Sequence, residues 1–146
     1  MAFHALEHFA AAKGARLRAV TAETQGSDYE ACTADIDGAL WRVRTARITP
    51  TKPGAFVAVW RRGPDGETEP FDAGDPTAGL LVLVPDGPRF GAFAFPGEVL
   101  CTLGVYSSSS SAGKRGFRLY PAWSTGLNPQ AERTRAAQAP YFEQVD

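Results

Sequence analysis

The sequence predicts a single α/β domain, in which a central mixed β-sheet starts with an antiparallel hairpin and is flanked by helices. The chain has 146 residues, the length of about one domain. Its apolar pattern changes period along the chain and indicates a helix, about six strands with one short helix between them, and a final helix. A strong turn signal early in the chain adds the hairpin.

The first helix is expected over residues 3–13, where Phe3 and Leu6 fall on one side. Gly14 follows and is typical of a helix C-terminus, because glycine readily adopts a left-handed conformation. Residues 15–28 are polar and lack a clear period. We therefore expect an irregular lead-in there.

The hairpin is predicted by alternation on both sides of one dipeptide. Residues 29–37 alternate between apolar and polar side chains. Asp37-Gly38 then supplies two residues that tolerate positive φ, as a two-residue hairpin turn requires. Residues 39–48 are predicted to return as the partner strand.

Prolines and glycines separate the later elements. The acidic stretch over residues 63–78 contains three prolines and is expected to be a surface loop. Asn128-Pro129 supplies a cap and a first-turn proline for the last helix. The remaining strands are expected at residues 55–61, 80–84, 90–95 and 117–120, and the remaining helices at residues 96–103 and 129–138.

Composition excludes several classes of protein. The longest apolar run is too short to cross a bilayer, and the N-terminus lacks the pattern of a secretory signal. Two cysteines, Cys32 and Cys101, are too few for a disulfide-dense scaffold. We expect a cytoplasmic protein without a membrane partner, present as a monomer or weak dimer.

His4 and His8, the only two histidines, share one helical face with Glu7 nearby, a spacing that can bind zinc. A third ligand would have to be distant in the sequence. We interpret the pair as accidental and predict no metal site.

The charges are segregated, although the net charge is only −1. Residues 40–62 contain six bases and no acid, whereas residues 63–87 contain six acids and no base. Residues 110–135 contain five bases and one acid. Most bases are arginines, which suit forked contacts with phosphate. A serine-rich loop before Lys114 and Arg115 departs from a nucleotide-binding loop, but its hydroxyls and cations suit phosphate contacts.

Four motifs have an idiosyncratic spacing, and they are followed by Gln130-Ala131 and Tyr141-Phe142. With this spacing, residues 29–142 resemble the MepB-like family, and residues 1–28 form an N-terminal helix and lead-in. The family is named for a gene found beside a multidrug efflux pump and its repressor. The motifs are Arg44-x-Ala46-Arg47-Ile48-Thr49-Pro50-Thr51-Lys52, Gly54-x-Phe56-Val57-x-x-Trp60-Arg61-Arg62, Phe93-x-Phe95-Pro96-x-x-Val99-Leu100 and Gly113-Lys114-Arg115-Gly116-Phe117-Arg118-x-Tyr120-Pro121-x-Trp123.

The resemblance implies a restriction-endonuclease-like fold, related to the PD-(D/E)xK nucleases. An active member would hold Mg²⁺ with two carboxylates beside a lysine. Asp35 or Asp37 fits the first carboxylate, but Thr45 stands at the second position and Arg47 at the lysine. One carboxylate is a poor magnesium site, so the motif is degenerate.

The sequence therefore predicts a non-catalytic protein without a cofactor that binds the nucleic-acid backbone, with DNA favoured over RNA. One alternative is a Mg²⁺-dependent nuclease with an atypical site, using Asp35, Asp37 and Arg47. Another is an interaction or anion-binding module linked to efflux or stress response. Arg44 and Arg47 could instead pair across the hairpin with Asp35, Asp37 or Glu30. The predicted phosphate-binding residues are Arg44, Arg47, Lys52, Arg61, Arg62, Lys114, Arg115 and Arg118.

Overall fold

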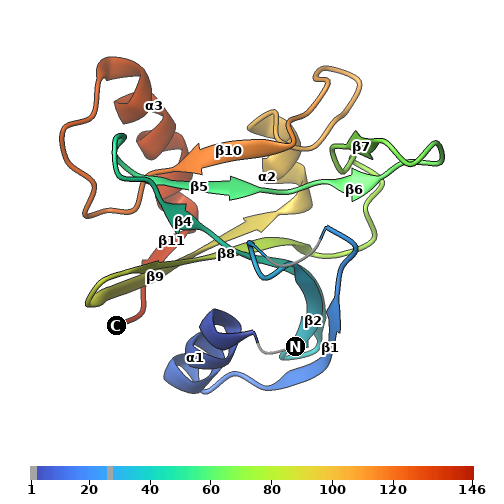
Figure 1. Cartoon of the computed structure of the whole chain (residues 1–146), viewed down its shortest axis with the longest axis horizontal. Helices are drawn as coiled ribbons and strands as arrows, with labels where there is room; N and C mark the ends of the chain where they lie inside the picture. Colours follow the sequence, from blue (N-terminus) through green and yellow to red (C-terminus); the bar gives the residue numbers. More distant parts are fainter. Residues whose placement is uncertain (1–2, 26–27) are drawn as a thin grey trace.

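Strand β8 (Gly79–Asp86) lies inside a six-stranded main sheet with the order β1-β2-β3-β8-β9-β11, as the computed structural model shows (Figure 1). The structure describes residues 3–25 and 28–146; residues 1–2 and 26–27, within the predicted N-terminal segment, lie outside the described part. The pair β3–β8 is parallel and the other pairs are antiparallel. The other strands of this sheet are β1 (Leu17–Ala22), β2 (Cys32–Ile36), β3 (Ala39–Thr45), β9 (Arg89–Pro96) and β11 (Phe142–Gln144).

A second sheet covers one face of the main sheet. It has the order β10-β5-β4, and β6 and β7 form a separate two-stranded hairpin at its end (Figure 1). Helix α1 covers the opposite face of the main sheet, below it in Figure 1. The bounds are β4 (Arg47–Ile48), β5 (Ala55–Ala58), β6 (Arg61–Arg62), β7 (Thr68–Glu69), β10 (Gly116–Leu119), α1 (His4–Lys13), α2 (Gly97–Thr102), α3 (Pro129–Gln138) and a 3₁₀ turn (Ala139–Tyr141).

Alternation along β8 divides the apolar core into two layers. Leu80, Val82 and Val84 pack toward the second sheet, while Leu81 and Leu83 pack toward α1. Successive side chains of a strand point to opposite faces, so a strand covered on both faces is apolar throughout. The apolar run that the sequence shows here is the central strand of this layered domain.

The local turn and cap signals are confirmed. Asp37 and Gly38 both have positive φ, 52° and 96°, in the turn between β2 and β3. Gly14 ends α1 with φ 66°. The Asn128 side chain accepts a hydrogen bond from the backbone N–H of Ala131 at 2.8 Å, which caps α3. These features depend on neighbouring residues alone and were readable from the sequence.

Two of the expectations about strands were wrong, and one strand was not predicted. The lead-in contains β1, an exposed edge strand with a register shift in its pairing to β2. Residues 39–48 form β3 and β4 in different sheets, because the chain leaves the main sheet at Ala46, whose N–H bonds to the carbonyl of Leu83. The C-terminal strand β11 had no prediction. Each feature is fixed by pairing with a distant strand.

The predicted class, a single α/β domain with a mixed sheet and an antiparallel hairpin at its start, is confirmed. Within the described ranges, no helix is long and apolar enough to span a membrane.

Candidate functional site

Arg44 is the only basic residue in the described part of the chain that is fully buried, with 0% of its surface exposed. It lies on β3, and its side chain points between the two sheets because its neighbour Val43 packs toward α1. Its guanidinium bonds to both carboxylate oxygens of Glu23, to the side chain of Gln25 and to the carbonyl of Val43. Arg44 therefore holds the fold together and presents nothing to a ligand.

Arg42 extends this network toward the acidic loop. It bonds to Glu23 at 2.7 Å and to Asp75 at 2.7 Å, and its guanidinium lies 4.1 Å from the centre of the Phe71 ring. Burial would raise the pKa of Asp75, but hydrogen bonds from Arg42 and Thr77 outweigh it, so that pKa lies below its usual value. Asp75 of this loop thus neutralises a largely buried arginine.

Gln25 connects this network to the second sheet. Its amide donates to the carbonyl of Ala58 at 2.7 Å and accepts from the backbone N–H of Trp60 at 3.1 Å. Its oxygen also accepts from Arg44 at 2.8 Å. The alternative in which Arg44 pairs across the hairpin is wrong in its partners, because these come from the segment after β1.

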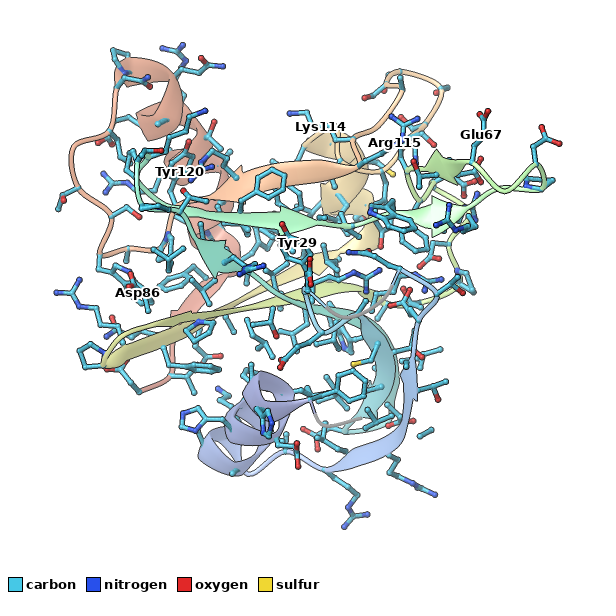
Figure 2. The ribbon with its side chains drawn as sticks, viewed as in Figure 1. Tyr29, Glu67, Asp86, Lys114, Arg115 and Tyr120 are labelled. Carbon is cyan, nitrogen blue, oxygen red and sulfur yellow. The ribbon has the colours of Figure 1, made fainter. Side chains whose placement is uncertain are left out.

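The arginines at the end of the second sheet also bond to other groups of the protein. Arg61 pairs with Glu69 and Asp72 at 2.9 Å each, and Arg62 donates to the carbonyl of Gly66. Arg115 donates to the carbonyl of Thr68. Figure 2 shows Arg115 beside the β6–β7 hairpin, near Glu67. These three cations lie in a mixed-charge region.

A different face of the second sheet carries cations that form no ion pair with the residues that the structure describes. We call the surface of β4-β5-β10 that points away from the main sheet the outer face. Ala55 and Val57 of β5 are buried inward, so Phe56 points outward. Phe56 is paired in register with Arg47 on one side and with Arg118 on the other. An aromatic ring between two arginines therefore crosses the outer face.

A groove of about 740 Å³ adjoins the outer face where α3 packs beside β10. Strand β10 lies at the edge of its sheet, and the buried Gln138 of α3 completes its hydrogen bonds: it accepts from the N–H of Tyr120 at 3.0 Å and donates to the carbonyl of Arg118 at 2.9 Å. We name the groove between β10 and α3 the basic groove. Its lining residues are Phe56, Leu103, Val105, Lys114, Gly116, Phe117, Arg118, Tyr120, Asn128, Gln130, Ala131, Arg133, Thr134, Ala137 and Gln138.

The cations of the basic groove have no acidic partner within the described ranges. Lys114, Arg118 and Arg133 form no ion pair there, and none of the described lining residues is acidic. Arg118 donates to Thr49 and to the carbonyl of Pro53, but its Nε has no hydrogen-bond partner in the described part. The groove can therefore accept an anion.

Of the predicted phosphate-binding residues, the structure brings Lys114 and Arg118 into the basic groove, with Arg47 on the adjoining outer face. Lys52 is exposed and lines a separate hollow of about 260 Å³ beside Trp123. The structure thus brings only some of these residues together. Arg44 and Arg61 form ion pairs elsewhere, and Arg62 and Arg115 lie at the β6–β7 hairpin, where each donates to a backbone carbonyl.

Asp35, Asp37 and Arg47, the residues of the nuclease alternative, are not brought together. Asp35 accepts a hydrogen bond from the N–H of Gly38, and Asp37 accepts one from the N–H of Arg16. Both carboxylates thus stabilise the β2–β3 turn, whereas Arg47 lies in the second sheet. The described residues contain no cluster of three or more metal-ligating side chains.

Sequence reasoning missed the contribution of α3. Arg133 lies one turn before Ala137 on the same helical face, and this face forms the wall of the groove together with Gln130. A helix without a large apolar side chain, next to a Lys/Arg block, was the available signal. Phe56 is only partly buried and lines the groove.

Comparisons with known proteins agree with this architecture. The MepB-like family model matches residues 23–144. The crystal structure of MepB is similar, with a TM-score of 0.86 and 28% sequence identity over 99% of each chain. No curated protein matches the chain in sequence. Because the family model covers most of the sequence and the solved structure aligns from end to end, the chain belongs to the MepB-like family.

Proposed function

We propose that this protein binds the phosphate backbone of nucleic acid through the basic groove and the adjoining outer face. The observation that carries the proposal is the set of three cations, Lys114, Arg118 and Arg133, without an acid among the described lining residues. Arg47 continues the positive surface across β4. Arginine and lysine side chains are among the usual donors to phosphate oxygens in nucleic-acid complexes.

Electrostatics explains why these cations favour an anionic partner. Like charges on neighbouring elements repel each other, and a polyanion relieves that repulsion while it releases its own counterions. In the neighbouring β6–β7 hairpin, by contrast, Arg61 is neutralised by Glu69 and Asp72. The groove thus differs from that hairpin in charge balance as well as in shape.

The parallel β3–β8 pair and the antiparallel β2–β3 hairpin support a relation to the restriction-endonuclease-like fold. The connection from β3 to β8 runs through the second sheet, where a helical crossover is the more usual link. On this view the nuclease-like sheet serves as a scaffold for binding, and Asp35 and Asp37 serve as turn residues.

Fluorescence anisotropy with labelled oligonucleotides at several salt concentrations tests the proposal. The first variant replaces Lys114, Arg118 and Arg133 by glutamine. The matched control replaces Lys13, Arg16 and Arg18 by glutamine, which removes the same charges from the α1–β1 side of the molecule. Thermal melts confirm that both variants are folded.

We expect the wild type and the control to bind with similar affinity and steep salt dependence. The groove variant should bind more weakly, and its slope of log K against log salt should be smaller by about 2, since each single-strand phosphate contact contributes about 0.7. Equal losses of affinity in both variants would show that binding depends only on the net charge of the protein. That outcome, or no binding by the wild type, would overturn the proposal.

A further inference from the structure

The β6–β7 hairpin bonds to three cations at the end of the second sheet, Arg61, Arg62 and Arg115. We infer that the hairpin is an autoinhibitory clamp, in which acidic side chains occupy Arg61 until a phosphate chain displaces them. This inference rests on the proposed function and adds the regulation of the same binding surface.

Two carboxylates bind Arg61 in the way that phosphate oxygens would. Its Nε donates to Oε1 of Glu69 and its Nη2 donates to Oδ2 of Asp72, each at 2.9 Å. The planar guanidinium presents the same fork of N–H groups to carboxylates and to phosphates. The two kinds of anion therefore compete for Arg61.

The ion pairs of Arg61 are accessible to a ligand. The side chains of Arg61, Glu69 and Asp72 are 39%, 39% and 43% exposed. Ion pairs at this exposure contribute little to stability and are weakened by salt. Arg44, in contrast, has none of its surface exposed and is out of a ligand's reach. A polyanion can thus take Arg61 from its carboxylates while the domain stays folded.

The hairpin contacts the loop that carries Lys114. A Cβ built on Gly113 would lie 2.8 Å from Cβ of Pro70, so the chain that follows β7 packs against the residue before Lys114. Arg115 donates to the carbonyl of Thr68 in β7. Figure 2 shows Arg115 between Lys114 and the hairpin. The cations that the hairpin holds therefore adjoin the basic groove, and their release would extend its positive surface.

The same hairpin offers a matched pair of variants. The release variant, Glu69→Gln with Asp72→Asn, removes the two carboxylates that bind Arg61. The control variant is Asp65→Asn with Glu67→Gln. These two acids are exposed and form no ion pair with any residue that the structure describes. Both variants remove the same charge, but only the first frees Arg61.

Fluorescence anisotropy at several salt concentrations measures binding to a labelled twelve-nucleotide oligothymidylate and to its duplex with oligoadenylate. We expect the release variant to bind each probe about fivefold more tightly than the wild type, because Arg61 no longer has to leave its carboxylates. Its slope of log K against log salt should be steeper by about 0.7–0.9, the contribution of one added phosphate contact. The control variant should gain less than about twofold in affinity, with an unchanged slope.

Hydrogen exchange adds a readout that net charge does not move. Arg61 and Glu69 are paired in register across β6 and β7, and a cross-strand ion pair stabilises so short a hairpin. Oligothymidylate should therefore speed amide exchange in the hairpin of the wild type. The release variant should show fast exchange without a ligand, and the control variant should behave as the wild type. Thermal melts confirm that both variants are folded.

The outcomes separate this inference from the proposed function. If the wild type binds and the release variant binds no better, the groove binds nucleic acid and the clamp is wrong. Equal gains in affinity and salt slope for the release and control variants would also overturn the clamp, because the charge of the hairpin would then explain them. If no protein binds either probe, the proposed function and the clamp both fail.

Discussion

Replacing Arg44 by methionine should strongly destabilise the protein although Arg44 never reaches its surface. The change removes a fully buried guanidinium that bonds to Glu23, Gln25 and the carbonyl of Val43. Methionine fills a similar volume, so the main loss is electrostatic and leaves Glu23 with one counter-charge in a largely buried position.

The structure allows the size of this effect to be worked out. Breaking a buried ion pair by removal of one partner costs about 3–5 kcal/mol. Glu23 keeps its 2.7 Å bond to Arg42, and Gln25 keeps its bond to the N–H of Trp60, so we expect a value near the lower end. At roughly 2–4 °C per kcal/mol for a chain of this size, the melting temperature should fall by roughly 6–12 °C.

Urea unfolding followed by tryptophan fluorescence measures the change in the free energy of unfolding. Arg47→Met is the matched control, because Arg47 is exposed and has no ion pair within the described ranges, so its loss should change stability by less than about 0.5 kcal/mol. A change below about 1 kcal/mol for Arg44→Met, or equal changes in both variants, would refute the reasoning.

Three further predictions concern the network, the thiols and a close backbone approach. The pKa of Asp75 is lower in the folded state than in the unfolded state. Its contribution to the free energy of unfolding should therefore be complete above the usual carboxyl pKa of about 4 and should disappear as the pH falls further. The free energies of unfolding in urea of the wild type and Asp75→Asn should therefore differ by about 1–3 kcal/mol at pH 7 and converge near pH 2. Burial raises the pKa of Cys32 to about 12, so a thiol reagent at pH 8 should modify only the partly exposed Cys101 until the protein unfolds. Gly54→Ala should cost about 3 kcal/mol in urea unfolding and Gly66→Ala only about 1 kcal/mol, since both have positive φ but a Cβ on Gly54 would lie 2.5 Å from the carbonyl oxygen of Leu119; equal costs would contradict this.

The elements that the sequence predicted well are those with local causes. The Asp37-Gly38 turn, the end of α1 at Gly14 and the cap of α3 at Asn128 depend on a few consecutive residues. Strands β1 and β11 were missed because they are largely exposed, and only the hydrogen bonds of a neighbouring strand make them regular. Local propensity carries little information about such edge strands.

The candidate site was predicted in part. The Lys/Arg block around Lys114 and Arg118 is visible in the sequence and lies in the basic groove. Nothing in the sequence indicated which arginines would meet an acid, and Arg44 and Arg61 look no different from Arg118 there. Their partners Glu23 and Asp72 come from segments that only folding brings close.

The sequence by itself determined the family, the α/β class and the segregation of charge, because motifs, periodicity and composition are properties of neighbouring residues. Only the tertiary structure decided which cations are free. The second sheet buries one face of β3 and converts Arg44 into an internal support, while α3 adds Arg133 to the exposed set. The physical reason is that the role of a charged side chain depends on the acids and the solvent around it. Contacts between segments that are distant in the sequence determine both.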